Sequence, residues 1–352
     1  MSTAAGRPPL LVLSASDVRA VLGYAECADA MRSALASRAR GEVFQPLRSV
    51  IKPDAAAGFM GLMPCYASGA NAAYSLKAIC VTPGNPAAGL DAHQGVVLLS
   101  SPDTGEPLAV LNASAVTEIR TAAVSAVATD LLAAPGADVL AIIGTGVQAA
   151  AHLRAIAATR PLTQIRVAGT TPAKAAAFAA ARAGSATSGK GGAGGTIGAA
   201  RVPVVPCDSA RQAVAGAGIV VTATSSSTPV LQAGWLAPGT HVNAIGACMP
   251  HVRELDTATV AGAALFADSR ESVLAESGDY RLAAAEAGLG PGHIRAEIGE
   301  LLADLEGRQG RNTPNEITIF ESLGLAVEDL AAAVVAYRAA REAGLGTSVE
   351  FG

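Results

Sequence analysis

The stretch LAIIGTGVQAAAHL (Leu140–Leu153) passes from apolar residues through Gly144, Thr145 and Gly146 into a segment rich in alanine. This order predicts a buried strand, a tight turn and a helix. Gly144 and Gly146 let the backbone approach a bound pyrophosphate, and the amides of the helix's first turn favour anionic oxygens. Ala149 fills the third position of the G-x-G-x-x-G pattern, where a small residue lets helix and strand pack closely. An ordinary strand-to-helix turn uses the same glycines, so the motif alone does not distinguish the two.

The residues that follow favour the dinucleotide interpretation. From Asp138 onward, apolar strand-like runs alternate with helix-like runs; the strand-like runs are VLAIIG, QIRVAG, VPVVP, IVVTAT, HVNAIGA and LFADS. Apolar strands at this spacing predict a doubly wound (Rossmann) α/β domain, in which helices cover both faces of a parallel sheet. A second strand at the expected distance from the glycine turn supports a bound dinucleotide.

The end of that second strand bears on cofactor choice. An NAD site usually has Asp or Glu there, which binds the ribose diol. This chain instead reads AGTTPAK, with Gly169, Thr170, Thr171 and Lys174 and no acidic residue. The hydroxyls and the lysine predict a site for a 2′-phosphate, and hence NADPH, with NADH still possible. The same residues could also simply cap the helix that starts near Pro172.

The first third of the chain has a different pattern of predicted helices and strands. One helix is expected over Ser16–Arg40, with Ser16 as its N-cap. Short strands follow at LRSVIK, FMGLMPCY, AYSLKAICV and GVVLLSS, and SPDTGEPLAVLN predicts a hairpin whose turn is formed by residues 103–106. This part therefore reads as an α+β domain.

Two further segments complete the predicted organisation. Residues 184–200 are rich in Gly and Ser and predict a flexible surface insertion. The segment EITIFESLGLAVEDLAAAVVAYRAAREAG predicts a strand, a turn and a strongly amphipathic helix. Because it follows what we expect to be a complete sheet, this helix is predicted to return to the first domain. The predicted division is 1–125 with 320–352, and 126–319.

Composition limits the possible partners and compartment. The 352 residues carry a formal charge of -4 and include 51% hydrophobic and 15% charged residues, which predicts a globular protein. No basic stripe indicates nucleic-acid binding, and no apolar run is long enough for a membrane span. PPLLVLSAS is too short for a secretory leader. The five cysteines are unclustered, which favours a reducing, cytoplasmic environment; they are Cys27, Cys65, Cys80, Cys207 and Cys248.

Several motifs in one order identify a family. IGTGVQA, TEIRTAAVSAVATDLLA, NAIGACMPHVREL and EITIFESLGLAVEDLAAA together resemble the ornithine cyclodeaminase/mu-crystallin family over nearly the whole chain. The resemblance implies a homodimer in which a dinucleotide-binding domain is inserted into a substrate-binding and dimerisation domain. It also implies hydride transfer at the carbon that bears the amine or imine of an amino acid or cyclic imino acid.

The resemblance also assigns the substrate site. The family's carboxylate-binding arginines correspond to Arg48 and Arg120, and its active-site lysine to Lys77. A guanidinium can hold a carboxylate by two parallel hydrogen bonds. A partly desolvated lysine near another cation can exchange protons with nitrogen near neutral pH. Without the resemblance, a surface position for each would be the simpler interpretation. Met63 is expected near the substrate ring.

Cys248 is the informative departure from the family pattern. Ornithine cyclodeaminases resemble one another in having Asp at this position, which suits binding of a distal amine. A thiol is mostly protonated at neutral pH and cannot replace that charge. Mu-crystallin and the imine reductases of the family are similar in having a small uncharged residue there. The preferred interpretation is therefore a ketimine reductase that converts pyrroline-2-carboxylate or piperideine-2-carboxylate to L-proline or L-pipecolate.

Three alternatives stay open: an ornithine cyclodeaminase, an alanine-type amino-acid dehydrogenase, and a mu-crystallin-like protein that binds NADPH without turnover. No metal is expected, because Cys248 and His251 lack a second ligand pair. The residues expected to contact the cofactor are Arg120, Thr121, Gly144, Thr145, Gly146, Val147, Gln148, Gly169, Thr170, Thr171, Lys174, Thr224, Ser225, Gly246, Ala247, Cys248 and Gly324.

Overall fold

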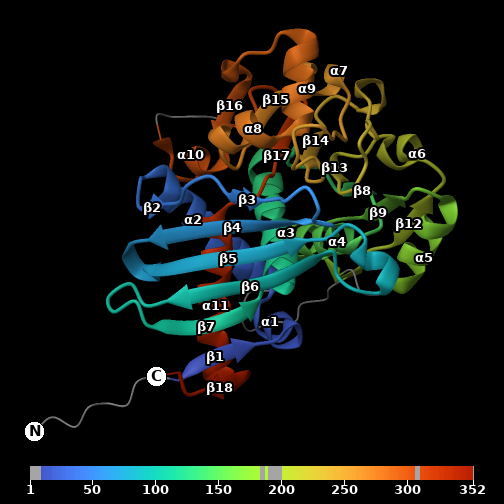
Figure 1. Ribbon diagram of the computed structural model, residues 1–352. Helices are drawn as coiled ribbons and strands as arrows, with labels where there is room; N and C mark the ends of the chain where they lie inside the picture. The colour runs from blue at the N-terminus through green and yellow to red at the C-terminus, as the bar shows by residue number, and fades with distance from the viewer. Residues whose placement is uncertain (1–8, 183–186, 189–199, 306–309, 352) are drawn as a thin grey trace, which may run out of the picture. The chain divides into compact units, whose positions relative to one another are not determined.

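The computed structural model describes residues 9–182, 187–188, 200–305 and 310–351, which form two compact units (Figure 1). The first unit comprises residues 1–120 and 325–352, and the second comprises residues 121–324. The sequence predicts the two boundaries between these units at residues 125/126 and 319/320, whereas the structure has them at residues 120/121 and 324/325. The predicted insertion at 184–200 lies largely outside the described residues. At its edges, β10 (Thr187–Ser188) pairs with β11 (Ala200–Arg201).

The first unit is built on one mixed sheet with the strand order β18-β1-β7-β6-β5-β4-β2, in which β3 also pairs with β4. Only β1 and β7 are parallel among its pairs. The predicted hairpin joins β6 to β7, and Gly105 in its turn has a φ of +75°. The strands are β1 (Leu10–Leu13), β2 (Val43–Phe44), β3 (Ser49–Ile51), β4 (Phe59–Ala67), β5 (Ala73–Val81), β6 (His93–Ser100), β7 (Pro107–Asn112) and β18 (Thr347–Val349).

The single helix expected over Ser16–Arg40 is instead two helices, α1 (Ala15–Val21) and α2 (Tyr24–Ala39). Ser14, not Ser16, is the N-cap of α1, because its hydroxyl accepts from the Asp17 amide while its own amide donates to the Asp17 carboxylate. Leu22 takes an extended conformation that buries its side chain and ends α1. Gly23 then starts α2.

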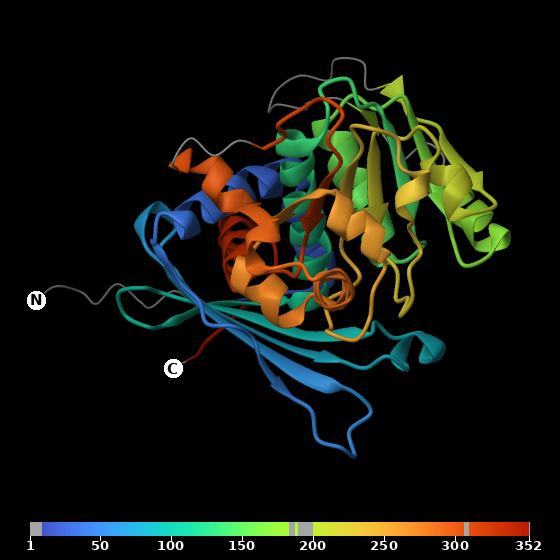
Figure 2. The same ribbon diagram turned by 90° about the horizontal axis from the view of Figure 1, so that it is seen from above.

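Helices cover one face of this sheet. Helix α11 (Ala326–Ala343) packs against β4, β5, β6 and α2, and Figure 2 shows α2 in blue and α11 in red on the same side of the sheet. The helix was expected to be amphipathic, but its residues 326–334 are all buried. The opposite face of the sheet has exposed apolar side chains, among them Met60, Tyr74 and Val96.

The second unit is a parallel eight-stranded sheet with the order β12-β9-β8-β13-β14-β17-β15-β16. The predicted doubly wound fold is therefore confirmed, and the order reverses between β8 and β13. One expectation was wrong: EITIF does not follow a complete sheet, because β17 lies between β14 and β15. The strands are β8 (Val139–Ile143), β9 (Gln164–Ala168), β12 (Val204–Cys207), β13 (Ile219–Thr222), β14 (His241–Ala244), β15 (Ala264–Ala267), β16 (Ile294–Glu297) and β17 (Thr318–Glu321).

Short helices connect these strands. They are α4 (Val147–Thr159), α5 (Pro172–Arg182), α6 (Ala210–Val214), α7 (Thr257–Gly262), α8 (Arg270–Glu276), α9 (Gly278–Ala287) and α10 (Ile298–Leu302), and α3 (Ala113–Leu132) crosses the boundary between the units. No helix in the described part of the chain is both long and apolar enough to span a membrane.

Candidate functional site

In the first unit, Lys77 lies in a buried cluster of charges. It faces inward from the middle of β5, and only 3% of its side chain is exposed. Its Nζ lies 2.7 Å from Asp329 Oδ2 and donates to Thr117 Oγ1 at 3.5 Å. Burial, with smaller contributions from the charges of Arg120 and Arg48, lowers the pKa of Lys77 to about 8. An amine with that pKa can hold or release a proton near neutral pH.

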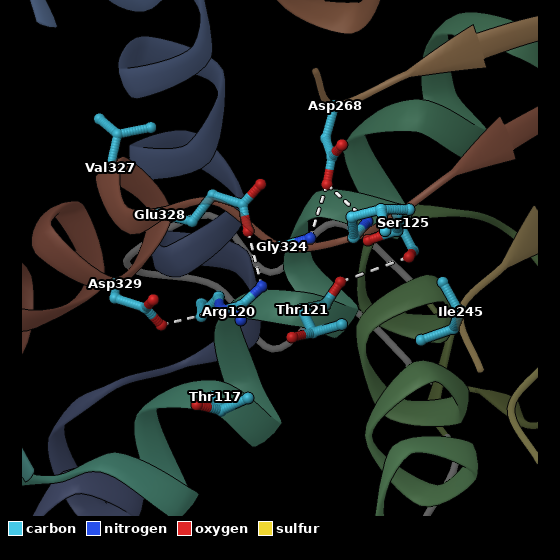
Figure 3. A network of polar contacts seen from close by, with 12 residues as sticks. Thr117, Arg120, Thr121, Ser125, Ile245, Asp268, Gly324, Val327, Glu328 and Asp329 are labelled. Carbon is cyan, nitrogen blue, oxygen red and sulfur yellow. Dashed lines mark hydrogen bonds and ion pairs between the residues drawn. The ribbon is translucent and has the colours of Figure 1, made fainter. Parts of the chain in front are cut away.

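Arg120 joins the same cluster from α3. Its Nη1 donates to Glu328 Oε2 at 2.7 Å and its Nε to Asp329 Oδ1 at 2.9 Å, as Figure 3 shows. Burial favours the neutral form of Asp329, but the charges of Arg120 and Lys77 outweigh it and hold the pKa of Asp329 below its usual value. Both acids lie in the first turn of α11, where the helix dipole also favours negative charge.

The structure brings the predicted substrate residues of this unit together. Met63 on β4 is the register partner of Lys77 and is buried on the same face. Arg48, half-buried between β2 and β3, is close enough for its charge to affect Lys77. The cluster formed by Arg48, Lys77, Arg120, Glu328 and Asp329, called the charge cluster below, holds three basic and two acidic side chains.

Glu328 and Asp329 were not predicted from the sequence. They lie more than 200 residues from Arg120 along the chain, so no local spacing links them to it. A signal did exist: LAVEDLAAAVV places two adjacent acids in an otherwise apolar helical segment. Lys, Arg, Asp and Glu are rarely buried without partners, so such a pair predicts buried cations elsewhere in the chain.

In the second unit, the predicted glycine turn lies between β8 and α4, next to the point where the strand order reverses. Gly144 has a φ of +130°, and a Cβ there would lie 2.3 Å from the Ala223 carbonyl oxygen. Gly146 is the N-cap of α4, without a side-chain cap. A Cβ on Gly146 would meet nothing within 4 Å. Gly144 is thus required by the protein itself, whereas nothing in the free protein requires Gly146.

The other predicted cofactor residues of this unit follow neighbouring strands. Because all these strands are parallel, the residues lie along one edge of the sheet. The residues after β9 are Gly169, Thr170 and Thr171; after β13, Thr224 and Ser225; after β14, Gly246, Ala247 and Cys248; and after β17, Gly324. Val147 and Gln148 open α4, and Thr121 is buried in α3.

A pocket of about 400 Å³ lies beside the glycine turn. It is lined by Thr145, Lys174, Ala177, Phe178 and Arg182. The Arg182 guanidinium carbon lies 4.1 Å from the centre of the Phe178 ring. Thr171 Oγ1 accepts from the Lys174 amide at 3.3 Å, so Thr171 does cap α5. Phe178 and Arg182, in the second half of that helix, were not predicted from the sequence.

Carboxylates bind several loop amides along this edge. Asp268 Oδ2 accepts from the amides of Leu323 and Gly324 at 2.7 and 2.6 Å (Figure 3). Glu254 accepts from the amides of Thr224 and Gly246 at 2.6 and 2.7 Å. The predicted contacts at Thr224, Gly246 and Gly324 therefore cannot use these backbone amides as donors without breaking the bonds.

Cys248 is half-buried in the loop after β14. Its Sγ lies 3.2 Å from the Ile245 carbonyl oxygen, and it is one of five free thiols. In the part of the chain that the structure describes, no group of three or more His, Cys, Asp or Glu side chains is placed to hold a metal ion.

Comparison with known proteins places these features in context. The model of the ornithine cyclodeaminase/mu-crystallin family matches residues 10–344. The ketimine reductase mu-crystallin of Mus musculus is 37% identical over 310 residues, which are 87% of this chain and 90% of the relative.

Two solved structures share the fold over 97% of this chain. The first is Thermococcus litoralis Δ1-pyrroline-2-carboxylate reductase in complex with NADH and L-proline, with a TM-score of 0.89, 35% identity and 100% of that chain covered. The second is an archaeal alanine dehydrogenase dimer with bound NAD, with a TM-score of 0.87, 29% identity and 99% of that chain covered.

Proposed function

The chain belongs to the ornithine cyclodeaminase/mu-crystallin family, and from that premise we propose that it reduces cyclic 2-carboxy imines with NADPH. It is an NAD(P)H-dependent oxidoreductase acting on imines, in keeping with relatives named ketimine reductase and pyrroline-2-carboxylate reductase. The proposed substrates are pyrroline-2-carboxylate and piperideine-2-carboxylate, and the proposed products are L-proline and L-pipecolate.

The charge cluster is the observation that carries this proposal. It gathers three basic side chains in one place, and guanidinium and ammonium groups are the types that bind a carboxylate. Arg48 and Arg120 hold that carboxylate and so orient the ring carbon next to it. Arg120 is itself fixed by Glu328 and Asp329, so its guanidinium is positioned before the substrate arrives.

Lys77 supplies or holds the proton in this proposal. Below pH 8 it is an ammonium group, paired with Asp329. Proton donation to the ring nitrogen makes the imine carbon more electrophilic, and Asp329 holds the Nζ in place throughout. The nicotinamide cofactor, when bound, supplies the hydride that reduces this carbon. Water is the competing proton source.

Cys248 favours a closed ring over ornithine as the substrate. Its thiol is directed to the carbonyl of Ile245 and provides no carboxylate for a distal ammonium. Pyrroline-2-carboxylate and piperideine-2-carboxylate have no distal ammonium and need no such partner.

The glycine turn fits a dinucleotide. Gly146 lies in open space at a φ of -86°, which any residue could adopt. Neither its backbone conformation nor its packing accounts for a glycine here, whereas a phosphate group approaching the backbone does. The residues proposed to hold the pyrophosphate are Thr145, Gly146, Val147 and Gln148.

Basic residues of α5, the helix that follows β9, favour NADPH over NADH. The pocket of about 400 Å³ has Lys174 and Arg182 in its lining and no acidic residue. A 2′-phosphate carries the negative charge that these cations attract, whereas the ribose diol of NADH prefers a carboxylate acceptor.

The exposed sheet face of the first unit is the proposed homodimer interface. Its outward side chains on β4 and β5 include Met60, Leu62, Tyr66, Tyr74 and Leu76. Apolar patches of this kind usually mark protein interfaces. The archaeal alanine dehydrogenase of the same fold is a dimer. The five free thiols support a reducing compartment, which we propose to be the cytoplasm.

A kinetic comparison tests this function. NADPH and NADH are each supplied with pyrroline-2-carboxylate and with piperideine-2-carboxylate, and the loss of reduced cofactor is followed by absorbance. In parallel, ornithine and alanine are supplied with NAD and with NADP. Alanine oxidation is followed by the formation of reduced cofactor, whereas ornithine conversion is followed by the release of ammonia and the formation of proline, because cyclisation regenerates the cofactor. We expect cofactor oxidation with a cyclic imine, faster with NADPH.

Each of the other possible results would support one of the three alternative functions. Turnover of ornithine alone would indicate a cyclodeaminase, and turnover of alanine alone an alanine-type dehydrogenase. Saturable binding of NADPH with no turnover of any substrate would indicate a mu-crystallin-like binding protein.

A further inference from the structure

Glu254 joins the loops that follow two neighbouring strands of the parallel sheet. It is fully buried, and neither of its carboxylate oxygens faces solvent. Oε1 accepts from the Thr224 amide after β13 at 2.6 Å, and Oε2 accepts from the Gly246 amide after β14 at 2.7 Å. Hydrogen bonds of this length to a carboxylate are strong and directional.

The main chain of Glu254 is itself held on both sides. Its amide and that of Leu255 donate to Asp279 Oδ1 at 2.7 and 2.8 Å. Its carbonyl accepts from the amides of Val230 and Leu231 at 2.7 and 3.0 Å. The carboxylate is therefore a fixed point to which the two loops are attached.

This attachment fixes the direction of two peptide planes. No peptide bond in the described chain is cis, and in a trans peptide the C=O points opposite to the N–H. Since the N–H groups of Thr224 and Gly246 point at Glu254, the carbonyls of Ala223 and Ile245 point away from it. The Ala223 oxygen is directed towards Gly144, because a Cβ on that glycine would lie 2.3 Å from it.

The Ala223 carbonyl thus lies where the strand order reverses, between β8 and β13. Nucleotides bind at such a point in doubly wound sheets. A carbonyl there accepts hydrogen bonds and favours positive charge, whereas an amide does the opposite. The nicotinamide half of the cofactor offers hydrogen-bond donors and becomes positively charged when it has given up its hydride.

We propose that Glu254 is a positioning residue that holds the Ala223 carbonyl towards the nicotinamide half of the cofactor, and that fixes in the neighbouring loop the Ile245 carbonyl, which accepts from the Cys248 thiol. This inference rests on the proposed function, and it adds a determinant of cofactor binding far in sequence from the glycine turn. Glu254 itself touches neither cofactor nor substrate. It acts through the two peptide planes that it holds.

Glu254→Gln tests the proposal, because an amide cannot accept from both N–H groups and one peptide must turn. The readout is the affinity for two ligands: NADPH, and 2′-phospho-ADP-ribose, which lacks the nicotinamide ring. We expect NADPH affinity to fall by about tenfold or more, and fragment affinity to change by less than about twofold. Glu286→Gln is the matched control. Glu286 bonds Arg253 and Thr257 at an exposed position, so this substitution should leave both affinities unchanged.

The two affinities distinguish an error in the role proposed for Glu254 from an error in the proposed function. Equal losses for both ligands would indicate general damage to the fold and overturn the positioning role, as would no loss for either. Failure of the wild-type chain to bind either ligand would contradict the proposed function instead.

A second measurement keeps the proposal testable if Glu254→Gln does not fold. The amide resonances of Thr224 and Gly246 in the wild-type protein should lie at low field and stay there when NADPH is added, because both amides remain bound to Glu254. Large shifts of these two resonances with NADPH would show that they leave the carboxylate to bind the nucleotide, and would overturn the proposal.

Discussion

The two units build their candidate sites from different parts of the chain. In the first unit the site consists of side chains: Lys77 and Arg120 are held by Asp329 at 2.7 and 2.9 Å, all of them buried. In the second unit it consists mainly of backbone, where glycines leave room and carboxylates fix the loop amides. The first site offers charged side chains and an exchangeable proton, and the second offers room for a ligand next to the backbone and peptide groups of fixed orientation. Substitutions in the first site should therefore affect chemistry and stability. Those in the second should affect nucleotide affinity, and also stability where packing requires a glycine, as at Gly144.

The largest effect is expected from removing the proposed proton donor. Lys77→Ala should lower kcat by about 10²- to 10⁴-fold, the usual contribution of a general acid, while NADPH affinity stays unchanged. Lys52→Ala is the matched control, because Lys52 is exposed on the same unit. Steady-state kinetics with fluorescence titration of NADPH provide the measurement. Unaltered kcat would remove Lys77 from the mechanism.

The pH dependence of the wild-type enzyme tests whether the protonated form of Lys77 is the active one. The pKa of Lys77 is lowered to about 8, so the ammonium form dominates below that pH and is lost above it. A proton donor is therefore present at pH 7 and absent at pH 10. We expect kcat/KM for imine reduction to fall as the pH rises through about 8, and to rise there instead if the neutral amine is the active form.

Asp329→Asn should cause the next largest effect. It leaves Lys77 and Arg120 buried with one counter-charge fewer, and breaking a buried ion pair in this way costs about 3–5 kcal/mol. The free energy of unfolding from urea titration measures this loss. Asp29→Asn, at an acid whose side chain is 85% exposed, should change it by less than about 0.5 kcal/mol. A similarly small change for Asp329→Asn would show that the charge cluster contributes little to stability.

The glycine turn offers a pair of substitutions with opposite signatures. Gly146→Ala adds a methyl group in open space, so the melting temperature should fall only by the small cost of replacing an N-cap glycine with alanine, whereas NADPH affinity should fall by about tenfold or more. Gly144→Ala should destabilise the free protein by about 1–3 kcal/mol, because its φ is +130° and the new Cβ would meet the Ala223 carbonyl. Normal NADPH affinity in Gly146→Ala would contradict the assignment of phosphates to this turn.

The smallest effect concerns cofactor preference. Thr171→Asp places a carboxylate near the end of β9 and keeps an acceptor for the Lys174 amide, so α5 should remain capped. The ratio of kcat/KM for NADPH to that for NADH should fall by about tenfold, the effect of about 1.4 kcal/mol. An unaltered ratio would mean that the 2′-phosphate does not lie near Thr171.

Most of the second unit could be predicted because its determinants are local. The glycine turn and the apolar strands follow from residues close together in the chain, as does the hairpin turn at Gly105 in the first unit. The position of β17 could not be predicted, since strand order depends on packing across the sheet and not on sequence order. The break at Leu22 was missed because a buried extended residue leaves no sign in helical periodicity.

The candidate sites likewise contain residues that the sequence predicts and residues that it does not. Arg48, Lys77 and Arg120 were found through a resemblance of motifs, but their buried partners Glu328 and Asp329 come from the other end of the chain. Glu254 was missed for a related reason. Its role depends on the amides of two loops, and the sequence does not show which amides need an acceptor.

The transfer of deuterium from cofactor to product tests the central claim most directly. NADPH that carries deuterium at the transferable position of C4 is supplied with pyrroline-2-carboxylate, and the proline formed is analysed by mass spectrometry. The proposed reaction predicts one deuterium atom on the α-carbon of proline. Oxidation of the cofactor without deuterium in proline, or no oxidation at all, would contradict hydride transfer to a cyclic imine.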